Sequence, residues 1–532
     1  MDINQLLRSL SDRVLRQEVA LTLLYLYFLR LIASGLYKLF IYPYYVSPLR
    51  SLPGPKDHHF LIGHLLNQFG GSHPNEPYVS WMKRWPTVPL IRYFGFGNAD
   101  SVLVTSLDAH KEILQTKASS FEKPTFFRRM VRDIVGHNGL GLVEGEEHKK
   151  QRRALSALFS HKNVESFIPQ LRKKATDLCS LLDDKIRDEA GIADVVSLYS
   201  KTTLDIIGLF AAGKEPDELT LNSGGMPFTT CYQELFEPDG LGKLLIALNT
   251  VIPIRWLPIK ANRRFKEAYE TLHSQIQAVI RERIQELHPN KKTDPSAEQS
   301  LSSNDMLTWM VENKYYASDE DERWGEELIS DQMLTFLAAG HQTTADGLTW
   351  ATQLMIQHPA EEKRLREEIA HLGANYTYRE IEALPYLHNF CREVLRAQCP
   401  SINIGREAIE DVIIQGVLLP KGTTVMMQPA IVQKNPTIWG EDADEFRPDR
   451  WDALEQQATD SWAFTAFGHG PRGCIGKAFS MLEFKILLIE LVSRFRFARV
   501  EGDNRLVSEI EVVNPSPMLR PLGGLRMRVE RA

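Results

Sequence analysis

The chain has few cysteines, and their spacing does not suit a zinc site or a disulfide framework. Only five occur in 532 residues, at positions 179, 231, 391, 399 and 474, and no two form a C-x-x-C pair. Structural zinc sites use closely spaced cysteine and histidine pairs. The cysteines therefore argue against zinc and indicate a reducing compartment.

An excess of basic charge is also missing. Lys and Arg number 62 against 68 Asp and Glu, which gives a net charge of −6 and a pI near 6.2. The sequence has no basic tail, no RNA-binding signature and no internal repeat of fixed period. Nucleic acid is therefore not expected as a partner. A hydrophobic content of 43% and a charged content of 24% are those of an ordinary globular protein.

One long apolar run occurs, near the N-terminus. Residues 19–29 are uncharged, Arg30 interrupts the run, and residues 31–37 continue it, which approaches the roughly 20 residues that cross a bilayer. No small-residue cleavage site follows, so we predict a signal anchor; an amphipathic helix on the membrane surface is the alternative. Pro53-Gly54-Pro55 then breaks any helix. We expect an anchor and hinge over residues 1–50, with a transmembrane helix at about 19–37, and one catalytic domain over 51–532.

The catalytic domain is predicted to be mostly helical with some sheet. The apolar-poor segment Pro289–Asn304 indicates a surface loop, with a domain boundary as the alternative. A hairpin is expected where Val412–Leu418 and Thr423–Met427 flank Pro420-Lys421-Gly422. Other expected strands are Val88–Phe94 and Ser101–Thr105, and the expected helices are Lys149–Leu158, Val164–Arg187, 259–288, Glu326–Gln357, Pro385–Ala397 and Lys477–Phe495.

The most informative segment is Phe467-Gly-His-Gly-Pro-Arg-Gly-Cys-Ile-Gly476. Its glycines let the backbone turn tightly and bring N–H groups close to the sulfur of Cys474. Such donors, and the start of the following helix, favour a thiolate. Arg472 supplies a cation that could hold a carboxylate of a cofactor. The alternative interpretation is a surface turn with a buried free cysteine.

This segment resembles the haem-binding loop of cytochromes P-450, F-x-x-G-x-R-x-C-x-G, in which Phe467, Arg472 and Cys474 match fixed positions. The resemblance implies the cytochrome P-450 fold, mainly α with smaller β-sheets, and haem b (iron protoporphyrin IX) as cofactor. By the same resemblance Cys474 is the axial thiolate, which pushes electron density into the iron.

A second match is Ala338-Ala-Gly-His-Gln-Thr-Thr344, where the family has A/G-G-x-D/E-T-T on the distal side of the haem. The small residues Ala339 and Gly340 would let a flat cofactor approach the helix. The resemblance implies that Thr343 helps hold dioxygen and pass protons. Gln342 departs from the family pattern, because an amide cannot cycle a proton as an acid does. His341 is a candidate substitute donor, and a packed or solvated histidine is the alternative.

Haem carboxylates need cations, and the resemblance assigns several. The family's W-x-x-x-R pattern occurs as His148-Lys-Lys-Gln-Arg152, with His in place of Trp. Arg152, Arg472, His148 and Arg406 are expected to hold the haem propionates, with solvated surface charges as the alternative. Separately, Glu393, Arg396 and Arg450 are expected to form a buried charge triad that braces the core.

The resemblance implies a monooxygenase that inserts one oxygen atom from O2 into an apolar small molecule, by hydroxylation or epoxidation. The expected context is fungal secondary metabolism. NADPH-cytochrome P-450 reductase is the expected electron donor, on the cytosolic face of the endoplasmic reticulum membrane. An isomerase or dehydratase that needs neither O2 nor reductase, and a non-enzymatic haem protein, are the alternatives. The expected reductase-docking surface comprises Lys149, Lys150, Arg153, Lys477 and Lys485, and the expected pocket segments are Pro124–Val135, 225–255, Phe336–Ala339 and Ile402–Ile404.

Overall fold

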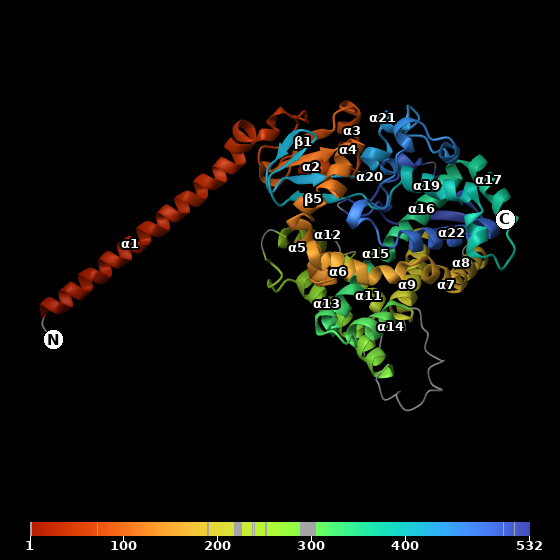
Figure 1. Cartoon of the computed structure of the whole chain (residues 1–532), viewed down its shortest axis with the longest axis horizontal. Coiled ribbons are helices and arrows are strands. Elements are labelled where there is room, and N and C mark those ends of the chain that lie inside the picture. Colours follow the sequence, from red (N-terminus) through yellow and green to blue (C-terminus); the bar gives the residue numbers. More distant parts are fainter. Residues whose placement is uncertain are drawn as a thin grey trace.

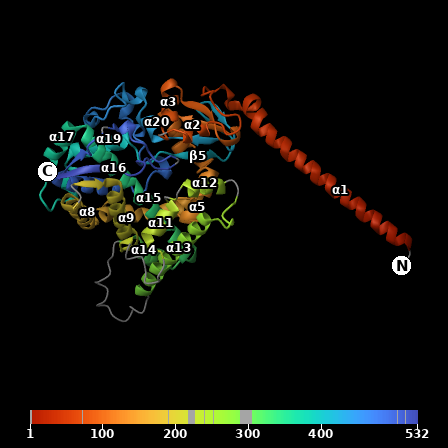
Figure 2. The ribbon, with the colours of Figure 1, turned by 180° about the vertical axis from the view of Figure 1, so that it is seen from behind.

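The computed structural model describes residues 3–532 except 72, 189–190, 217–225, 237, 239, 251–252, 288–304, 504 and 515. A long helix, α1 (Ile3–Leu36), projects from a mostly helical body, so that the N-terminus lies far from it (Figures 1 and 2). The predicted loop Pro289–Asn304 lies outside the described residues.

The apolar segment Glu18–Val46 covers the end of α1 and the helical turn after it. Its mean hydropathy is 1.8 and none of its most apolar window is buried, so by length and composition it could cross a membrane. A second apolar helix, α9 (Val195–Ala212), passes the same test but is 67% buried, which marks it as a core helix.

Helices form most of the body, and α9 packs among them at its centre (Figure 1). The sequence predicts α19 at its observed bounds and α13 and α22 to within two residues. Besides α1 and α9, the α-helices described are α2 (Leu65–Phe69), α3 (Glu76–Arg84), α4 (Leu107–Lys111), α5 (Thr125–Val135), α6 (Gly145–Leu155), α7 (His161–Ser166), α8 (Ile168–Asp188), α11 (Phe228–Phe236), α12 (Gly240–Asn249), α13 (Lys260–Glu286), α14 (Met306–Met310), α15 (Glu326–Gly340), α16 (Gln342–Gln357), α17 (Pro359–Ile369), α18 (Tyr378–Glu382), α19 (Pro385–Ala397), α20 (Pro429–Gln433), α21 (Pro436–Trp439) and α22 (Lys477–Arg494).

The strands form small sheets. One has the order β1-β2-β8-β5-β3, and it lies on the side of the body where α1 leaves (Figure 1). Another has the order β4-β10-β9. The strands described are β1 (Leu90–Phe94), β2 (Asp100–Val104), β3 (Phe121–Glu122), β4 (Ile192–Asp194), β5 (Gly405–Ala408), β6 (Val412–Ile414), β7 (Val417–Leu419), β8 (Thr424–Met426), β9 (Phe495–Arg499) and β10 (Arg526–Arg531).

The predicted hairpin around Pro420-Lys421-Gly422 is wrong. The turn instead lies at Gln415-Gly416, and it joins β6 to β7. Both residues have positive φ, 48° and 77°, which is the backbone that two-residue hairpin turns require. Beyond Gly422, β8 leaves for the other sheet, where it pairs with β2 in parallel and with β5 in antiparallel orientation.

The long helix predicted over Glu326–Gln357 is broken. Helix α15 ends at Gly340 and α16 begins at Gln342, with His341 between them. A Cβ on Gly340 would lie 2.5 Å from Cδ1 of Ile207 on α9, so this glycine serves close helix packing and not cofactor approach. The Thr343 hydroxyl donates to the carbonyl of Ala339 at 2.9 Å, a side-chain bond that competes with the helical ladder and bends helices.

Candidate active site

The cysteine loop folds back on itself ahead of α22. The backbone N–H of Cys474 donates to the carbonyl oxygen of Phe467 at 2.8 Å, which closes the loop. Gly468 and Gly470 have φ of 62° and 69°, and a Cβ on Gly470 would collide with the carbonyl oxygen of Leu114. Only glycine fits there. Because α22 begins at Lys477, Cys474 lies just before a helix N-terminus, where negative charge is favoured.

Cys474 differs from the other cysteines. Its side chain is exposed, whereas the remaining four are buried. Burial nevertheless raises the pKa of the Cys474 thiol, while the N–H of Gly476 and the charges of Arg152 and Lys477 lower it. The sulfur is thus surrounded by protein but has an open face, an arrangement that a metal bound from that side would complete. A coordinating metal deprotonates the thiol outright.

Ala339 and Thr343 present a similar opening on the broken helix. Ala339 is exposed and Thr343 is half-buried, although most of α15 and α16 is buried. The phenyl ring of Phe159 stacks on Phe336, with ring centroids 5.5 Å apart, and a Cβ on Gly476 would lie 3.7 Å from Phe159. Phe159 therefore connects the broken helix with the cysteine loop.

The two sides of the candidate site are also joined by hydroxyl groups. The Thr344 hydroxyl lies 3.1 Å from that of Ser480 on α22 and donates to Oε2 of Glu483 at 3.3 Å. Glu483 is buried, and burial raises its pKa well above the ordinary value. These contacts fix α16 against the helix that follows Cys474.

His341 does not face this opening. Its Nε2 lies 2.9 Å from the Ser200 hydroxyl on α9, and its Nδ1 lies 3.0 Å from the Tyr232 hydroxyl on α11. Burial lowers the pKa of His341 to about 3, so the ring is neutral. It is a packed histidine, the alternative named from the sequence.

Gln342 has a carboxyl partner. Its Nε2 donates to Oδ1 of Asp346 at 2.7 Å, and both residues are buried. Asp346 lies outside the family motif, but its spacing of four residues from Gln342 on a predicted helix is the signal that predicts this contact.

The predicted cofactor cations come together, and Lys123 joins them. They act on one another electrostatically through the folded chain. We call this group the cation cluster: Lys123, His148, Arg152, Arg406 and Arg472. Arg152 on α6 also donates to the carbonyl oxygen of Gly473 at 2.6 Å, which attaches α6 to the cysteine loop.

The cation cluster holds more positive than negative charge. Within the described part of the chain, its ion pairs all go to Glu144, which binds Lys123 at 3.2 Å and Arg472. Burial and neighbouring cations lower the pKa of Lys123 to about 8, and burial lowers that of Arg406 to about 10. Burying unmatched charge is costly, so the cluster is suited to an anionic ligand. The two carboxylates of haem b fit this requirement.

The predicted charge triad is confirmed. Arg396 binds Glu393 through two hydrogen bonds of 2.8 Å, and Arg450 binds it at 2.9 Å. The indole of Trp451 donates to the same carboxylate at 3.0 Å. Each of the three charged side chains is buried.

Several other expectations are corrected or limited. Lys485 is buried and paired with Glu382 at 2.7 Å, so it is no part of a basic docking surface. Of the expected pocket residues, Phe336 and Ile402 pack into the core.

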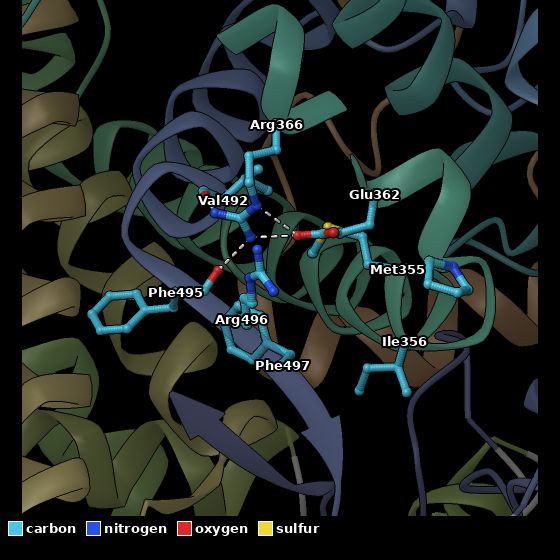
Figure 3. A pocket seen from close by; sticks show the side chains of 9 residues that line it. Met355, Ile356, Glu362, Arg366, Val492, Phe495, Arg496 and Phe497 are labelled. Atoms are coloured by element: carbon cyan, nitrogen blue, oxygen red, sulfur yellow. Dashed lines mark hydrogen bonds and ion pairs between the residues drawn. The ribbon is translucent and has the colours of Figure 1, made fainter. Parts of the chain in front are cut away.

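A cavity of about 200 Å³ lies between α16, α17, α22 and β9, where Arg366 pairs with Glu362 (Figure 3). It contains none of the predicted site residues.

Sequence reasoning missed Lys123, Glu144, Asp346 and Glu483. Lys123 and Glu144 lie in separate segments, and their contact at 3.2 Å depends on the fold. Glu483 lies on the predicted helix Lys477–Phe495, where a carboxylate between Leu482 and Phe484 is the available signal.

Comparisons with known proteins agree with this geometry. The cytochrome P450 family model matches residues 53–520. Cytochrome P450 monooxygenase sphH of Aspergillus fumigatus is 34% identical over 88% of this chain and 86% of its own length. Cytochrome P450 monooxygenase FUM15 of Gibberella moniliformis is 30% identical over 92% and 89%, and ALT8 of Alternaria alternata is 29% identical over 93% and 92%. The chain is thus an oxidoreductase whose cofactor is haem b, and it belongs to the cytochrome P450 family.

Proposed function

We propose that the protein is a membrane-anchored haem-thiolate monooxygenase that inserts one oxygen atom from O2 into an apolar small molecule. The observation that carries the proposal is the open face of Cys474 within the protein, beside a cluster of cations with too few anions. The relatives, all named cytochrome P450 monooxygenases, support the same reaction class. A role in fungal secondary metabolism is part of this proposal.

Each site residue has a role in this proposal. Cys474 holds the iron, and the Gly476 N–H stabilises the negative charge on its sulfur. Arg152, Arg406, Arg472 and His148 hold the propionates. When bound, haem b supplies the redox chemistry that activates O2, which no amino-acid side chain can supply.

The distal residues handle water and protons. Thr343 donates to the Ala339 carbonyl at 2.9 Å, so its oxygen remains available to accept a hydrogen bond from water. Ala339, near the end of the preceding helix α15, presents a methyl group, which leaves room for a flat ring. Phe467 closes the cysteine loop through its carbonyl oxygen.

We further propose that residues 1–50 anchor the catalytic domain, residues 51–532, to the endoplasmic reticulum membrane on its cytosolic face. Asn98 donates to the carbonyl oxygens of Leu39 and Phe60 at 3.0 and 2.7 Å, which places the exposed side chains of Phe60 and Phe96 beside the end of the apolar segment. Exposed apolar side chains next to an apolar segment suit lipid. NADPH-cytochrome P-450 reductase, reached on the same membrane, is the proposed electron donor.

The test is the carbon monoxide difference spectrum of the reduced protein. The wild type and Cys231→Ser, a buried-cysteine control, should show the strongly red-shifted Soret band of thiolate-ligated haem, and Cys474→Ser should not. An ordinary band in well-folded wild type would refute thiolate ligation. Product formation that needs both NADPH and reductase then separates a monooxygenase from an isomerase or dehydratase.

A further inference from the structure

Gln342 and Asp346 form a pair that the family pattern does not contain. Their side chains are 9% and 0% exposed, and the amide Nε2 donates to the carboxyl Oδ1 at 2.7 Å. Oε1 of Gln342 is also buried and makes no hydrogen bond within the residues that the structure describes. The pair thus combines a carboxyl group, an amide that holds it, and a buried acceptor without a partner among the described residues.

Both side chains lie close to Thr343 around the helix. At ~100° per residue, Asp346 points about 40° from Gln342 and about 60° from Thr343, between the two directions. All three residues belong to α16, so this relation does not depend on the break at His341. A carboxyl at 346 is therefore placed on the same helix face as the distal hydroxyl.

The amide at 342 is matched to the acid at 346. If position 342 carried the usual carboxylate, two carboxylates would meet inside the protein at hydrogen-bonding distance. Like charges so close cannot both ionise, and one would have to keep a proton. The pair in this chain avoids that repulsion, because the amide at 342 donates a hydrogen bond to the carboxyl at 346.

Two other groups could have supplied the missing acid, and their contacts argue against them. His341 has both ring nitrogens directed to Ser200 and Tyr232, on α9 and α11. Glu483 is reached through Thr344 from α22, the helix that follows the cysteine. Thr344 points about 100° away from Thr343 around α16.

We propose that Asp346 is the acid of the distal proton path, moved one helical turn from its usual position, and that Gln342 is its positioning residue. The carboxyl O–H bond breaks as its proton passes to a water molecule held at Oε1 of Gln342, beside the Thr343 hydroxyl. Asp346 then regains a proton from solvent-connected water, so its charge is unchanged over a turnover. This inference rests on the proposed monooxygenase function.

The experiment compares four forms of the haem-loaded enzyme: wild type, Gln342→Glu, Asp346→Asn, and the double variant that exchanges the two groups. Product formed per NADPH consumed should fall roughly tenfold or more in Asp346→Asn, because a lost general acid costs at least that factor. The double variant should return to within about threefold of wild type, since it restores an acid–amide pair. Gln357→Glu, at the end of the same helix, is the matched control and should behave as wild type.

A second readout does not depend on turnover. Infrared spectra of Gln342→Glu should show a carboxylic-acid carbonyl stretch shifted from that of wild type, because the two facing acids must share a proton. The same variant should have a lower melting temperature than either wild type or the double variant. An unshifted band together with an unchanged melting temperature would refute the pairing, even if Asp346→Asn does not fold.

Failure of this inference is distinguishable from failure of the proposed function. If the wild type shows the red-shifted carbon monoxide band and Asp346→Asn keeps its coupling of NADPH to product, Asp346 is not the acid. The same conclusion follows if Asp346→Asn is impaired and the double variant is not rescued, because the role would then be structural. If the wild type lacks the band, the haem-thiolate function itself fails.

Discussion

The chain contains two clusters of charged side chains that are satisfied in different ways. In the triad, Glu393 accepts hydrogen bonds from Arg396, Arg450 and Trp451. The remaining guanidinium N–H groups of Arg396 donate to backbone carbonyls of Gln433, Ala443 and Glu445. In the cation cluster, Glu144 is the one carboxylate in ion pairs with its members within the described chain.

The difference separates a structural cluster from a binding site. The triad is complete within the protein, so its geometry is needed whether or not a cofactor is present. The cation cluster concentrates desolvated positive charge, which is favourable only when an anion arrives. Loss of one triad member should therefore reduce stability, whereas loss of one cation should reduce cofactor binding.

The largest effect is expected for Glu393→Gln. This substitution leaves Arg396 and Arg450 buried without their shared carboxylate, and breaking a buried pair typically costs about 3–5 kcal/mol. Thermal and denaturant unfolding of the haem-free and haem-loaded protein measure the loss, which should be similar in both.

A matched control is Glu367→Gln. Glu367 pairs with Lys363 at 3.7 Å, and their side chains are 64% and 76% exposed. An exposed pair of this kind contributes about 0.5 kcal/mol or less. Equal losses in the two variants would contradict the structural role of the triad.

The next effect concerns cofactor binding. Arg406→Met removes a cluster member whose guanidinium donates to the carbonyl of Gly405 at 2.7 Å. Loss of one charge-assisted hydrogen bond to a propionate, about 1.5–3 kcal/mol, should speed haem loss roughly 10- to 100-fold. Transfer of haem to an excess of a haem-scavenging apoprotein measures this rate.

The stability of the haem-free Arg406→Met variant tests whether Arg406 serves cofactor binding and not the fold. Arg406→Met should leave it unchanged or raise it, because repulsion with Arg472 is relieved. Arg153→Met is the control, since Arg153 is the exposed neighbour of Arg152 on α6 and should keep its haem. Strong destabilisation of the haem-free Arg406→Met variant would place Arg406 with the structural residues instead.

Local sequence signals predict the parts of the fold that depend on local contacts. Helix α19 begins at Pro385, a favoured first position, and both of its predicted ends match. The partner predicted for β8 is wrong because one true partner, β2, is distant in sequence and the other, β5, lies beyond the β6–β7 hairpin. The close packing of Gly340 against Ile207 of α9 likewise depends on a contact between distant segments and cannot be read from the helix alone.

The residues of the candidate site also fall into those that local sequence signals identify and those whose contacts depend on the fold. Fixed spacings identified Cys474, Arg472 and Arg152, because the cysteine loop and α6 carry them in short motifs. Lys123 and Glu144 belong to no motif, and their contact arises only when the segment before α5 meets the loop before α6. Gln342 was recognised as unusual, but its meaning depended on finding the carboxyl of Asp346 at 2.7 Å.

The smallest effect, and the one most specific to the comparison, is the pH dependence contributed by His148. Burial, with Arg472, Lys123, Arg152 and Arg406 adding to it, lowers its pKa from 6.5 to about 3. The unfolded chain therefore binds a proton that the folded chain does not between about pH 6.5 and 3. The contribution of neutral His148 to the free energy of unfolding is fully present above pH 6.5 and is lost as the pH falls through this window. At about 1.4 kcal/mol per pKa unit, the loss is a few kcal/mol at most.

Haem should weaken this dependence, because propionates beside His148 raise its pKa towards the unfolded value. In the haem-free protein, His148→Gln should therefore flatten the acid side of the stability curve more than it does in the haem-loaded protein. His341 provides the contrast: burial lowers its pKa to about 3 as well, but Ser200 and Tyr232 hold it outside the cation cluster. Unfolding free energies from pH 4 to 7 for both forms of each variant measure the difference. If His148→Gln and His341→Gln respond to haem alike, the cation cluster is not where the carboxylates bind, and its surplus charge needs another partner.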